Sequence, residues 1–254
     1  MPKETIRQTI GVAAGVCIAC SVLVSTASVC LKPRQDRNKT LEKRMNILMA
    51  AGLLDSKGQD DVEKLFEQID TRVVDLSTHQ FLDLDPESVD PVKEAQDPGK
   101  SIEVQDRKLG IKRVGKHQLI HLKTKDGKID RVILPVVGKG LWSTMYGFLA
   151  LDRDMKTIQS MAFYQHGETP GLGGEVDNPK WKGSWIGKEA YDRQGDPAID
   201  VVKGRADRDA AHEVDGLSGA TLTSNGVENL VRFWLGDEGY GPVLEKLQAG
   251  GGDG

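Results

Sequence analysis

Hydroxyl-bearing side chains gather in one short stretch near the C-terminus. The segment DGLSGATLTSNGVENLVRFWLG, residues 215–236, holds four of them close together: Ser218, Thr221, Thr223 and Ser224. Hydroxyl groups donate hydrogen bonds to phosphate oxygens, and the small residues Gly219 and Ala220 let such a group come close to the backbone. The composition of the stretch therefore suggests a phosphate-binding segment.

An amphipathic helix must position these hydroxyls. Apolar residues recur after them at i, i+3, i+4 and i+7: Val227, Leu230, Val231 and Trp234. This spacing predicts a helix that begins close to Ser224 and Asn225. Thr221 then lies at the N-terminal end of the helix, which is called its mouth below. The unpaired N–H groups and the positive dipole end of a helix N-terminus favour an anion. The alternative is that Ser224 or Asn225 simply caps the helix.

A second stretch, YQHGETPGLGGEVDNPKWKG at residues 164–183, places two polar side chains among glycines. Glu168 and Thr169 could bind a ligand, and the glycines let a flat ring or an anionic group come close to the backbone. His166 beside them is either part of such a site or a structural histidine whose ring nitrogens are hydrogen-bonded within the protein. The chain shows no Walker loop, no GxGxxG after a strand and no HExxH. A hydrolase built on His166 and Glu168 lacks a placed nucleophile, so the pattern favours binding.

The residues before and between these stretches change to a period of two. HQLIHLKT (117–124) and KIDRVILPVV (128–137) flank an Asp-Gly pair, which is a hairpin signal. STMYGFLALD (143–152) and MKTIQSMAFYQH (155–166) supply two more candidate strands. The sequence predicts an α+β domain over residues 101–254, with a largely antiparallel sheet and flanking helices.

A helical segment and a linker are expected between residues 32 and 100. The stretch 38–55 has Leu41, Met45 and Leu48 on one stripe and Gly52 near its end, and the stretch 59–70 repeats the helical spacing. Residues 83–101, rich in Pro, Asp and Glu, follow as an ordered loop or linker, so a boundary is predicted near residue 100. The two helices form either a plain stalk or a partner-binding surface.

An uncharged segment lies near the N-terminus, after a short tail at residues 1–9. Ile10 to Leu31 is long enough to cross a bilayer core as a helix. A cleaved signal peptide is the alternative, although its apolar core would be shorter, at roughly 7 to 15 residues. A lipoprotein site at Cys30 is a further alternative, but Val29 stands where a small residue is expected. The segment is interpreted as a single transmembrane anchor.

All three cysteines lie inside this anchor: Cys17, Cys20 and Cys30. The remainder of the chain therefore forms no disulfide. Cys17 and Cys20 make a CxxC pair, but neither a second pair nor a histidine lies near them, so the pair does not predict a metal site.

Charge gives two further indications. The formal net charge of -4, without a clustered basic face, argues against a nucleic-acid partner. Basic residues follow the span more densely than they precede it: Lys32, Arg34, Arg37, Lys39, Lys43 and Arg44 against Lys3 and Arg7. The positive-inside rule alone would therefore keep the large domain in the cytoplasm.

The segment DGLSGAT, residues 215–221, matches the flavinylation motif D-x-x-[ST]-G-A-T. With the HGETPGLG stretch and the single N-terminal span, nearly the whole chain resembles the C subunit of the sodium-translocating NADH:quinone oxidoreductase. In that family a periplasmic flavin transferase, using FAD and magnesium, joins FMN through its phosphate to the last Thr of the motif. This resemblance implies a covalent FMN at Thr221, with Asp215 and Ser218 on the other fixed positions.

The resemblance also implies which residues line the flavin. The loop after His166 would contribute Glu168, Thr169, Gly171 and Leu172, and the segment before the third candidate strand would contribute Leu141, Trp142 and Ser143. Trp142 has the alternative of a core position. Lys203 is a candidate counter-charge for the phosphate or the reduced flavin, and an ordinary exposed lysine is its alternative. No residue is assigned a catalytic or metal-binding role.

The family implies a protein that relays electrons in a complex oxidising NADH, reducing quinone and moving sodium. Its partners would be the other subunits, the flavin transferase and membrane lipid. It would sit in the bacterial inner membrane with the flavin domain in the periplasm, despite the flanking charge. The alternatives are the flavin subunit of the ferredoxin-linked Rnf complex, which shares the SGAT signature, and a non-enzymatic anchored binding module.

Overall fold

The computed structural model describes residues 6–54 and 61–250 of the chain. The chain divides into two compact units, of which the first ends at Lys43 and the second begins at Arg44. Helix α1 runs from Ile6 to Ala50, with Pro33 inside it, so it belongs to both units. Its apolar window has a mean hydropathy of 2.2 and is exposed throughout. Among the described residues, it is the one helix long and apolar enough to cross a membrane.

Helix α1 contains the helix predicted over residues 38–55 as far as Ala50, and its last turns belong to the second unit. These turns continue the helix of the apolar segment without a break. Leu48 of the predicted stripe is buried, but Met45 is 37% exposed and Ile47 is buried in its place. The helix stops where predicted, since Gly52 adopts a left-handed conformation with φ of 66° just beyond it.

Two basic side chains from the sheet hold the C-terminal end of α1. Lys123 Nζ donates to the carbonyl oxygen of Ala51 at 3.2 Å, and Arg131 Nη1 donates to that of Ala50 at 2.9 Å. The last carbonyl groups of a helix receive no hydrogen bond from within the helix and carry its negative dipole end. Cationic donors at this position therefore stabilise the helix end on the sheet.

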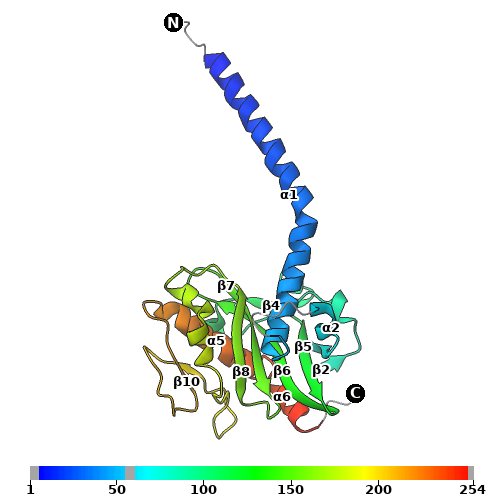
Figure 1. The fold of residues 1–254 in the computed structure, drawn as a ribbon, viewed down its shortest axis with the longest axis vertical. Helices are drawn as coiled ribbons and strands as arrows, with labels where there is room; N and C mark the ends of the chain where they lie inside the picture. The colour runs from blue at the N-terminus through cyan, green and yellow to red at the C-terminus, as the bar shows by residue number, and fades with distance from the viewer. Residues whose placement is uncertain (1–5, 55–60, 251–254) are drawn as a thin grey trace. The chain divides into compact units, whose positions relative to one another are not determined.

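The second unit is built on a six-stranded antiparallel sheet (Figure 1), which confirms the predicted α+β class. In the order β2-β1-β5-β6-β7-β8, its strands are Gln80–Leu82, Ile69–Asp75, His117–Lys125, Lys128–Lys139, Thr144–Asp152 and Ile158–Gln165. The predicted hairpin joins β5 to β6. Asp126 and Gly127 both have positive φ at its tip, as the tight turns of hairpins require.

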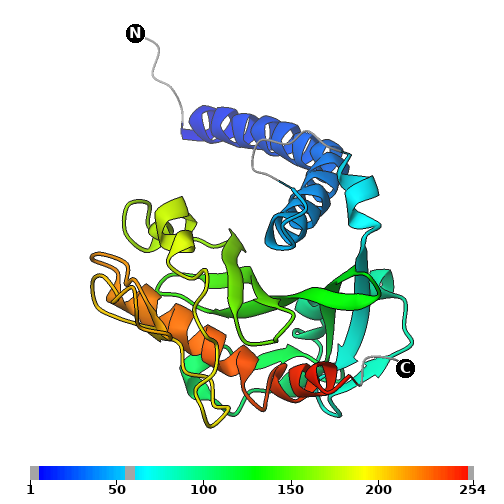
Figure 2. The same cartoon turned by 60° about the horizontal axis from the view of Figure 1, so that its bottom comes forward.

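Each face of the sheet buries its own apolar cluster, because neighbouring residues of a strand point to opposite faces. On one face Val132, Leu134 and Val136 of β6 pack with helices α5 (Thr221–Leu235) and α6 (Gly241–Gln248). Figure 2 shows these helices in orange and red along that face. On the other face Ile133 of β6 packs with the end of α1.

Two expectations for residues 59–100 are corrected by the structure. Within the described residues the predicted helix over 59–70 is only α2, Val62–Phe66, and Ile69 already begins β1. Strands β1 and β5 pair from Ile69↔Lys123 to Asp75↔His117, so the sheet crosses the boundary expected near residue 100. The β-branched residues Val73 and Val74 favour this strand.

Short elements complete the unit. The single-turn helices are η1 (Pro86–Ser88), α3 (Pro91–Glu94), η2 (Arg107–Leu109), η3 (Gly173–Asp177) and α4 (Pro179–Gly183). Strands β3 (Ser101–Glu103) and β4 (Arg113–Gly115) pair antiparallel, and β9 (Asp200–Val201) and β10 (Glu213–Val214) pair parallel.

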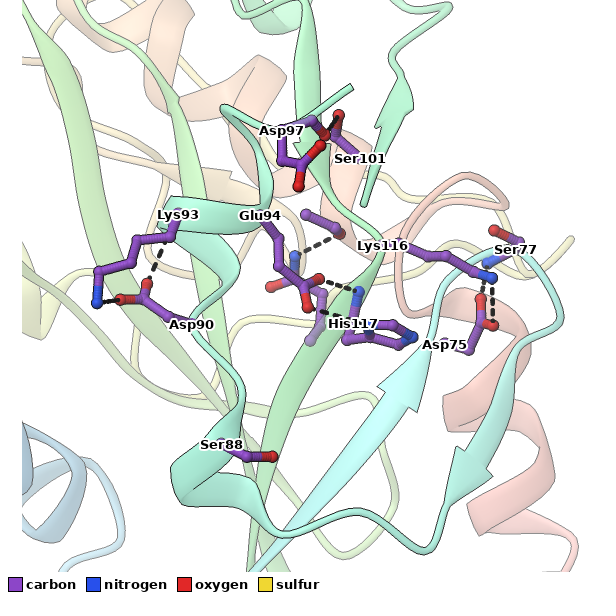
Figure 3. A network of polar contacts seen from close by, with 12 residues as sticks. Asp75, Ser77, Ser88, Asp90, Lys93, Glu94, Asp97, Ser101, Lys116 and His117 are labelled. Carbon is purple, nitrogen blue, oxygen red and sulfur yellow. Dashed lines mark hydrogen bonds and ion pairs between the residues drawn. The ribbon is translucent and has the colours of Figure 1, made fainter. Parts of the chain in front are cut away.

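A polar network ties the α3 segment to the sheet (Figure 3). The carboxylate of Glu94 accepts a hydrogen bond from the backbone N–H of His117 and pairs with its Nδ1, both at 3.0 Å. On the adjacent strand, buried Asp75 pairs with Lys116 Nζ at 3.1 Å and accepts from the N–H of Ser77 at 2.7 Å. Burial raises the pKa of the Asp75 carboxyl, but the bonds from Ser77 and Lys116 outweigh it and leave the pKa below its ordinary value.

We expect Asp75→Asn to lower the free energy of unfolding by about 2 kcal/mol at neutral pH, because a buried charge-assisted pair is lost. A carboxylate with a lowered folded pKa stabilises the fold above its unfolded pKa and loses that effect as the pH falls through the folded value. The gap between wild type and variant should therefore shrink below about pH 4. Denaturant unfolding of the full chain in detergent measures it, and parallel pH curves would contradict the assignment. Asp83→Asn, at an exposed site, is the control.

Candidate functional site

The N-terminal end of helix α5 is exposed to solvent and has no side-chain cap. It begins at Thr221, with Ala220 at the N-cap position, φ -132° and ψ 49°. The predicted start near Ser224 and Asn225 is therefore wrong by one turn. The N–H of Ser224 already donates to the carbonyl of Ala220 at 3.0 Å, and its hydroxyl accepts from the N–H of Leu217. Ser224 does not cap the helix, and the first-turn N–H groups are left for another acceptor.

Other residues of the DGLSGAT motif hold the loop before α5 in place. The side chain of Asp215 accepts from the N–H of Ala206 at 2.8 Å, and its carbonyl accepts from Trp181 Nε1 at 2.8 Å. Gly219 has a φ of 71°, a conformation that glycine adopts without strain. Ser218, Gly219 and Thr221 are exposed. Asp215 therefore shapes the loop, while Ser218 and Thr221 lie on its exposed side.

Two of the predicted phosphate-binding hydroxyls point inward instead. Thr223 is fully buried, and its hydroxyl donates to Oε2 of Glu168 at 2.7 Å. Ser224 is 4% exposed, and its hydroxyl oxygen accepts a hydrogen bond from the N–H of Leu217. Both expectations are corrected, because these side chains lie on the face of α5 that packs into the domain.

The resemblance implies that Glu168 lines the flavin, but its carboxylate is buried and fully engaged. It accepts from the backbone N–H groups of Leu141 at 3.2 Å, Trp142 at 3.0 Å and Ser143 at 3.2 Å, besides Thr223. Burial raises the pKa of this carboxyl, but the bond from Thr223 and the three backbone bonds outweigh it, so the pKa lies below its ordinary value. The carboxylate is a buried anion that joins three segments.

The loop containing Glu168 runs beside the motif. Thr169 and Leu172 are exposed, and Gly171 has a φ of 76°. A Cβ added at Gly219 would lie 3.0 Å from Cδ2 of Leu172, so the two loops are in contact. The structure therefore brings the second predicted stretch to the mouth of α5.

His166 belongs to the scaffold of that loop. Its Nε2 pairs with Asp177 at 2.8 Å, and its Nδ1 accepts from the N–H of Glu168 at 3.2 Å. Both ring nitrogens are engaged, which supports the structural alternative. Among the described residues, no group of His, Cys, Asp and Glu is arranged to hold a metal ion.

Apolar side chains stand exposed around the same mouth. Trp142 is 67% exposed, so its alternative as a core residue is wrong. Leu141, Leu172 and Leu222 are also exposed, and Leu222 is a residue that sequence reasoning missed. Its position next to Thr221, off the buried stripe, was the available signal. Lys203 is exposed, and the neighbouring Gly204 accepts from the N–H of Gly216 at 2.8 Å.

Close backbone contacts fix α5 against the end of β6. A Cβ at Gly226 would clash with the carbonyl oxygen of Lys139 and lie 3.3 Å from Cα of Gly140. A Cβ at Gly138 would lie 2.9 Å from Cβ of Leu230. These glycines let the helix lie directly on the strand, which places its first turn beside residues 140–143.

The arrangement suits an anion with a flat apolar group attached. The uncapped N-terminus of α5 provides backbone donors and a positive dipole end, and the exposed residue Thr221 provides a hydroxyl group. Exposed leucines and Trp142 flank it. A cavity of about 500 Å³ lies at the opposite, C-terminal end of the helix, lined among others by Tyr191, Arg232 and Phe233, and contains none of the predicted site residues.

Comparison with known proteins agrees with this geometry. The model of the FMN-binding domain family matches residues 140–236, which span the exposed tryptophan, the Glu168 loop and the whole of α5. The C subunit of the Na(+)-translocating NADH-quinone reductase of Pseudomonas aeruginosa is 48% identical, over 98% of each chain. That of Yersinia pestis is 46% identical, over 98% of this chain and 95% of the relative.

Solved structures show the same fold. The crystal structure of Shewanella oneidensis NqrC is 33% identical and superposes with a TM-score of 0.78, covering 84% of this chain and 99% of that one. The C subunit of the Na(+)-translocating NADH-quinone reductase of Parabacteroides distasonis is 26% identical with a TM-score of 0.65, covering 84% of this chain and 96% of that one. The similarity therefore extends over nearly the full length in sequence and over most of the chain in structure.

Proposed function

Since the chain belongs to the family of C subunits of Na(+)-translocating NADH-quinone reductases, we propose that Thr221 carries FMN through a phosphoester and that this flavin relays electrons within the complex. The chain is one subunit of an oxidoreductase complex, and the other subunits are its partners. Its full-length relatives favour the quinone reductase over the Rnf alternative.

One observation carries the proposal. Thr221, an exposed residue with a hydroxyl group, is the first residue of a helix that has no side-chain cap. Such an N-terminus has unpaired backbone donors directed at an incoming anion, and Gly219 removes a side chain from the approach. The residues present therefore fit a phosphate that is esterified to Thr221.

Around this tether the chain would hold the cofactor with few groups. The exposed hydroxyl of Ser218 and the first-turn N–H groups of α5 would bond the phosphate, with Lys203 as a counter-charge. Trp142, Leu141 and Leu172 would contact the ring, and Thr169 and Gly171 would form the loop beside it. When bound, FMN supplies the electron-carrying ring, while the protein supplies position and electrostatics.

The membrane anchor sets the location. We propose that α1 spans the bacterial inner membrane once, in contact with lipid, and that the flavin domain faces the periplasm, where a flavin transferase would modify Thr221. Large domains translocate despite basic flanking residues. The apolar segment Ile10 to Leu31 contains no carboxylate, so we expect no sodium path through this span alone.

Co-expression of the full chain with a flavin transferase tests the proposal. The purified chain should fluoresce in a denaturing gel and be heavier by one FMN less water. Fragment mass spectrometry should place that increment on Thr221. A colourless chain, in cells where the transferase modifies a control protein, would overturn the proposal and favour the anchored binding module.

We expect Trp142→Ala to retain the covalent FMN but change the environment of its ring. Trp142 is 67% exposed, so its removal should change the free energy of unfolding by less than about 0.5 kcal/mol. The absorption maximum and midpoint potential of the flavin should shift, because an aromatic contact is lost. Ile186→Ala, which removes another exposed apolar side chain outside the site, should leave both values unchanged.

A further inference from the structure

Hydrogen bonds from the protein itself occupy the acceptor sites of the buried Glu168 carboxylate. A carboxylate offers about four acceptor sites, and the side chain accepts four hydrogen bonds at 2.7 to 3.2 Å. The residue is 5% exposed. Glu168 therefore has no free acceptor directed to solvent or to a ligand at the mouth of α5.

These four bonds join parts of the chain that are far apart in sequence. Three donors are the consecutive N–H groups of Leu141, Trp142 and Ser143, in the turn between β6 and β7. The fourth is the hydroxyl of Thr223, in the first turn of α5. Glu168 thereby connects the turn that bears Trp142 to the helix that bears Thr221.

Two glycines leave room for the carboxylate. A Cβ at Gly140 would lie 2.5 Å from Oε1 of Glu168, and one at Gly173 would lie 2.8 Å from Oε2. Any larger residue at either position would displace the carboxylate. The chain therefore builds a fitted pocket around this anion.

Geometry links the pocket to the exposed side chains. The N–H groups of Leu141 and Trp142 point inward to the carboxylate, and both side chains are exposed. Thr223 is held inward at the third position of α5, while Thr221 and Leu222 face outward. The same anion therefore determines where Trp142 stands relative to Thr221.

We propose that Glu168 is a positioning residue, which sets the distance between the Trp142 turn and the Thr221 hydroxyl and does not itself touch the flavin. The part of this inference that concerns the flavin rests on the function proposed above. The bonding of residues 141–143 does not, so it can be tested on the unmodified chain.

Hydrogen exchange on the full chain in detergent, made without a flavin transferase, tests the bonding first. The amides of Leu141–Ser143 should be protected in the wild type although two of the side chains are exposed. Glu168→Gln loses at least one acceptor, and a bond worth about 1.4 kcal/mol corresponds to roughly ten-fold faster exchange in that peptide. Unchanged exchange in Glu168→Gln would overturn the proposal.

The flavin-bearing chain tests the positioning. Thr223→Val removes only the hydroxyl bond to Glu168, and Thr223→Ser keeps it. In chains that carry FMN, the Val variant should show lower flavin fluorescence anisotropy and a shifted midpoint potential, and the Ser variant should resemble the wild type. If the Val variant matches the wild type in both measurements, Glu168 is only structural and the proposal fails. If the wild type itself carries no FMN while residues 141–143 are protected, the proposed function has failed and the bonding by Glu168 stands.

Discussion

Replacing Thr221 with valine should abolish covalent flavin while leaving the fold intact. Valine keeps the shape of threonine but lacks the hydroxyl that forms the phosphoester. Because Thr221 is exposed in the first turn of α5, the free energy of unfolding of the valine chain should differ from that of the unmodified wild type by less than about 0.5 kcal/mol. Intact mass and in-gel fluorescence measure the flavin, and NADH-dependent quinone reduction by the assembled complex should fall to background.

Two variants separate the attachment from the surrounding motif. Thr221→Ser keeps a hydroxyl at the same place and should retain at least part of the flavin. Ser218→Ala removes an exposed hydroxyl nearby and should lower the extent of modification without abolishing it. A valine variant that still carries one FMN, with the increment mapped to another residue, would rule out Thr221 as the tether.

Gly226→Ala should destabilise the domain, although alanine is the better helix former by about 1 kcal/mol. The added Cβ would clash with the backbone carbonyl of Lys139, which cannot rotate away as a side chain does. Overpacking of this kind costs about 1 to 3 kcal/mol. We expect the melting temperature of the full chain to fall by roughly 5 °C. Flavin loading should fall too, because α5 must shift away from residues 140–143.

Gly183→Ala is the matched control for that variant. Gly183 ends helix α4, and a Cβ there would meet nothing within 4 Å. Helix propensity alone then decides, so the melting temperature should stay the same or rise slightly. Equal effects of the two substitutions would show that the contact of α5 with β6 tolerates a methyl group.

The sheet was predictable where local signals agree. Alternating apolar residues on both sides of Asp126 and Gly127 predicted the β5–β6 hairpin. The helix predicted over 59–70 was wrong at its end because Ile69 fits both a helical stripe and the first position of a strand. Its partner, Lys123, lies far along the chain, and no pattern in the sequence reports that pairing.

The site was predictable in its motif but not in its interior. The resemblance marked Thr221, but it did not separate hydroxyls that face solvent from those that face the core. Thr223 lies four residues before Val227 and seven before Leu230, so the buried stripe of α5 already included it. The burial of Glu168 had no such signal, because the donors that compensate it come from the turn at residues 141–143.

The alanine at the N-cap of α5 links the stability of the domain to its modification. A serine or aspartate there would stabilise the unmodified domain by about 1 kcal/mol, and the chain forgoes that gain. On the proposed attachment, the phosphate of FMN takes over the role of the missing cap. The unmodified domain should then unfold at a lower denaturant concentration than the flavin-bearing domain, because only the latter has an acceptor for the first-turn N–H groups of α5.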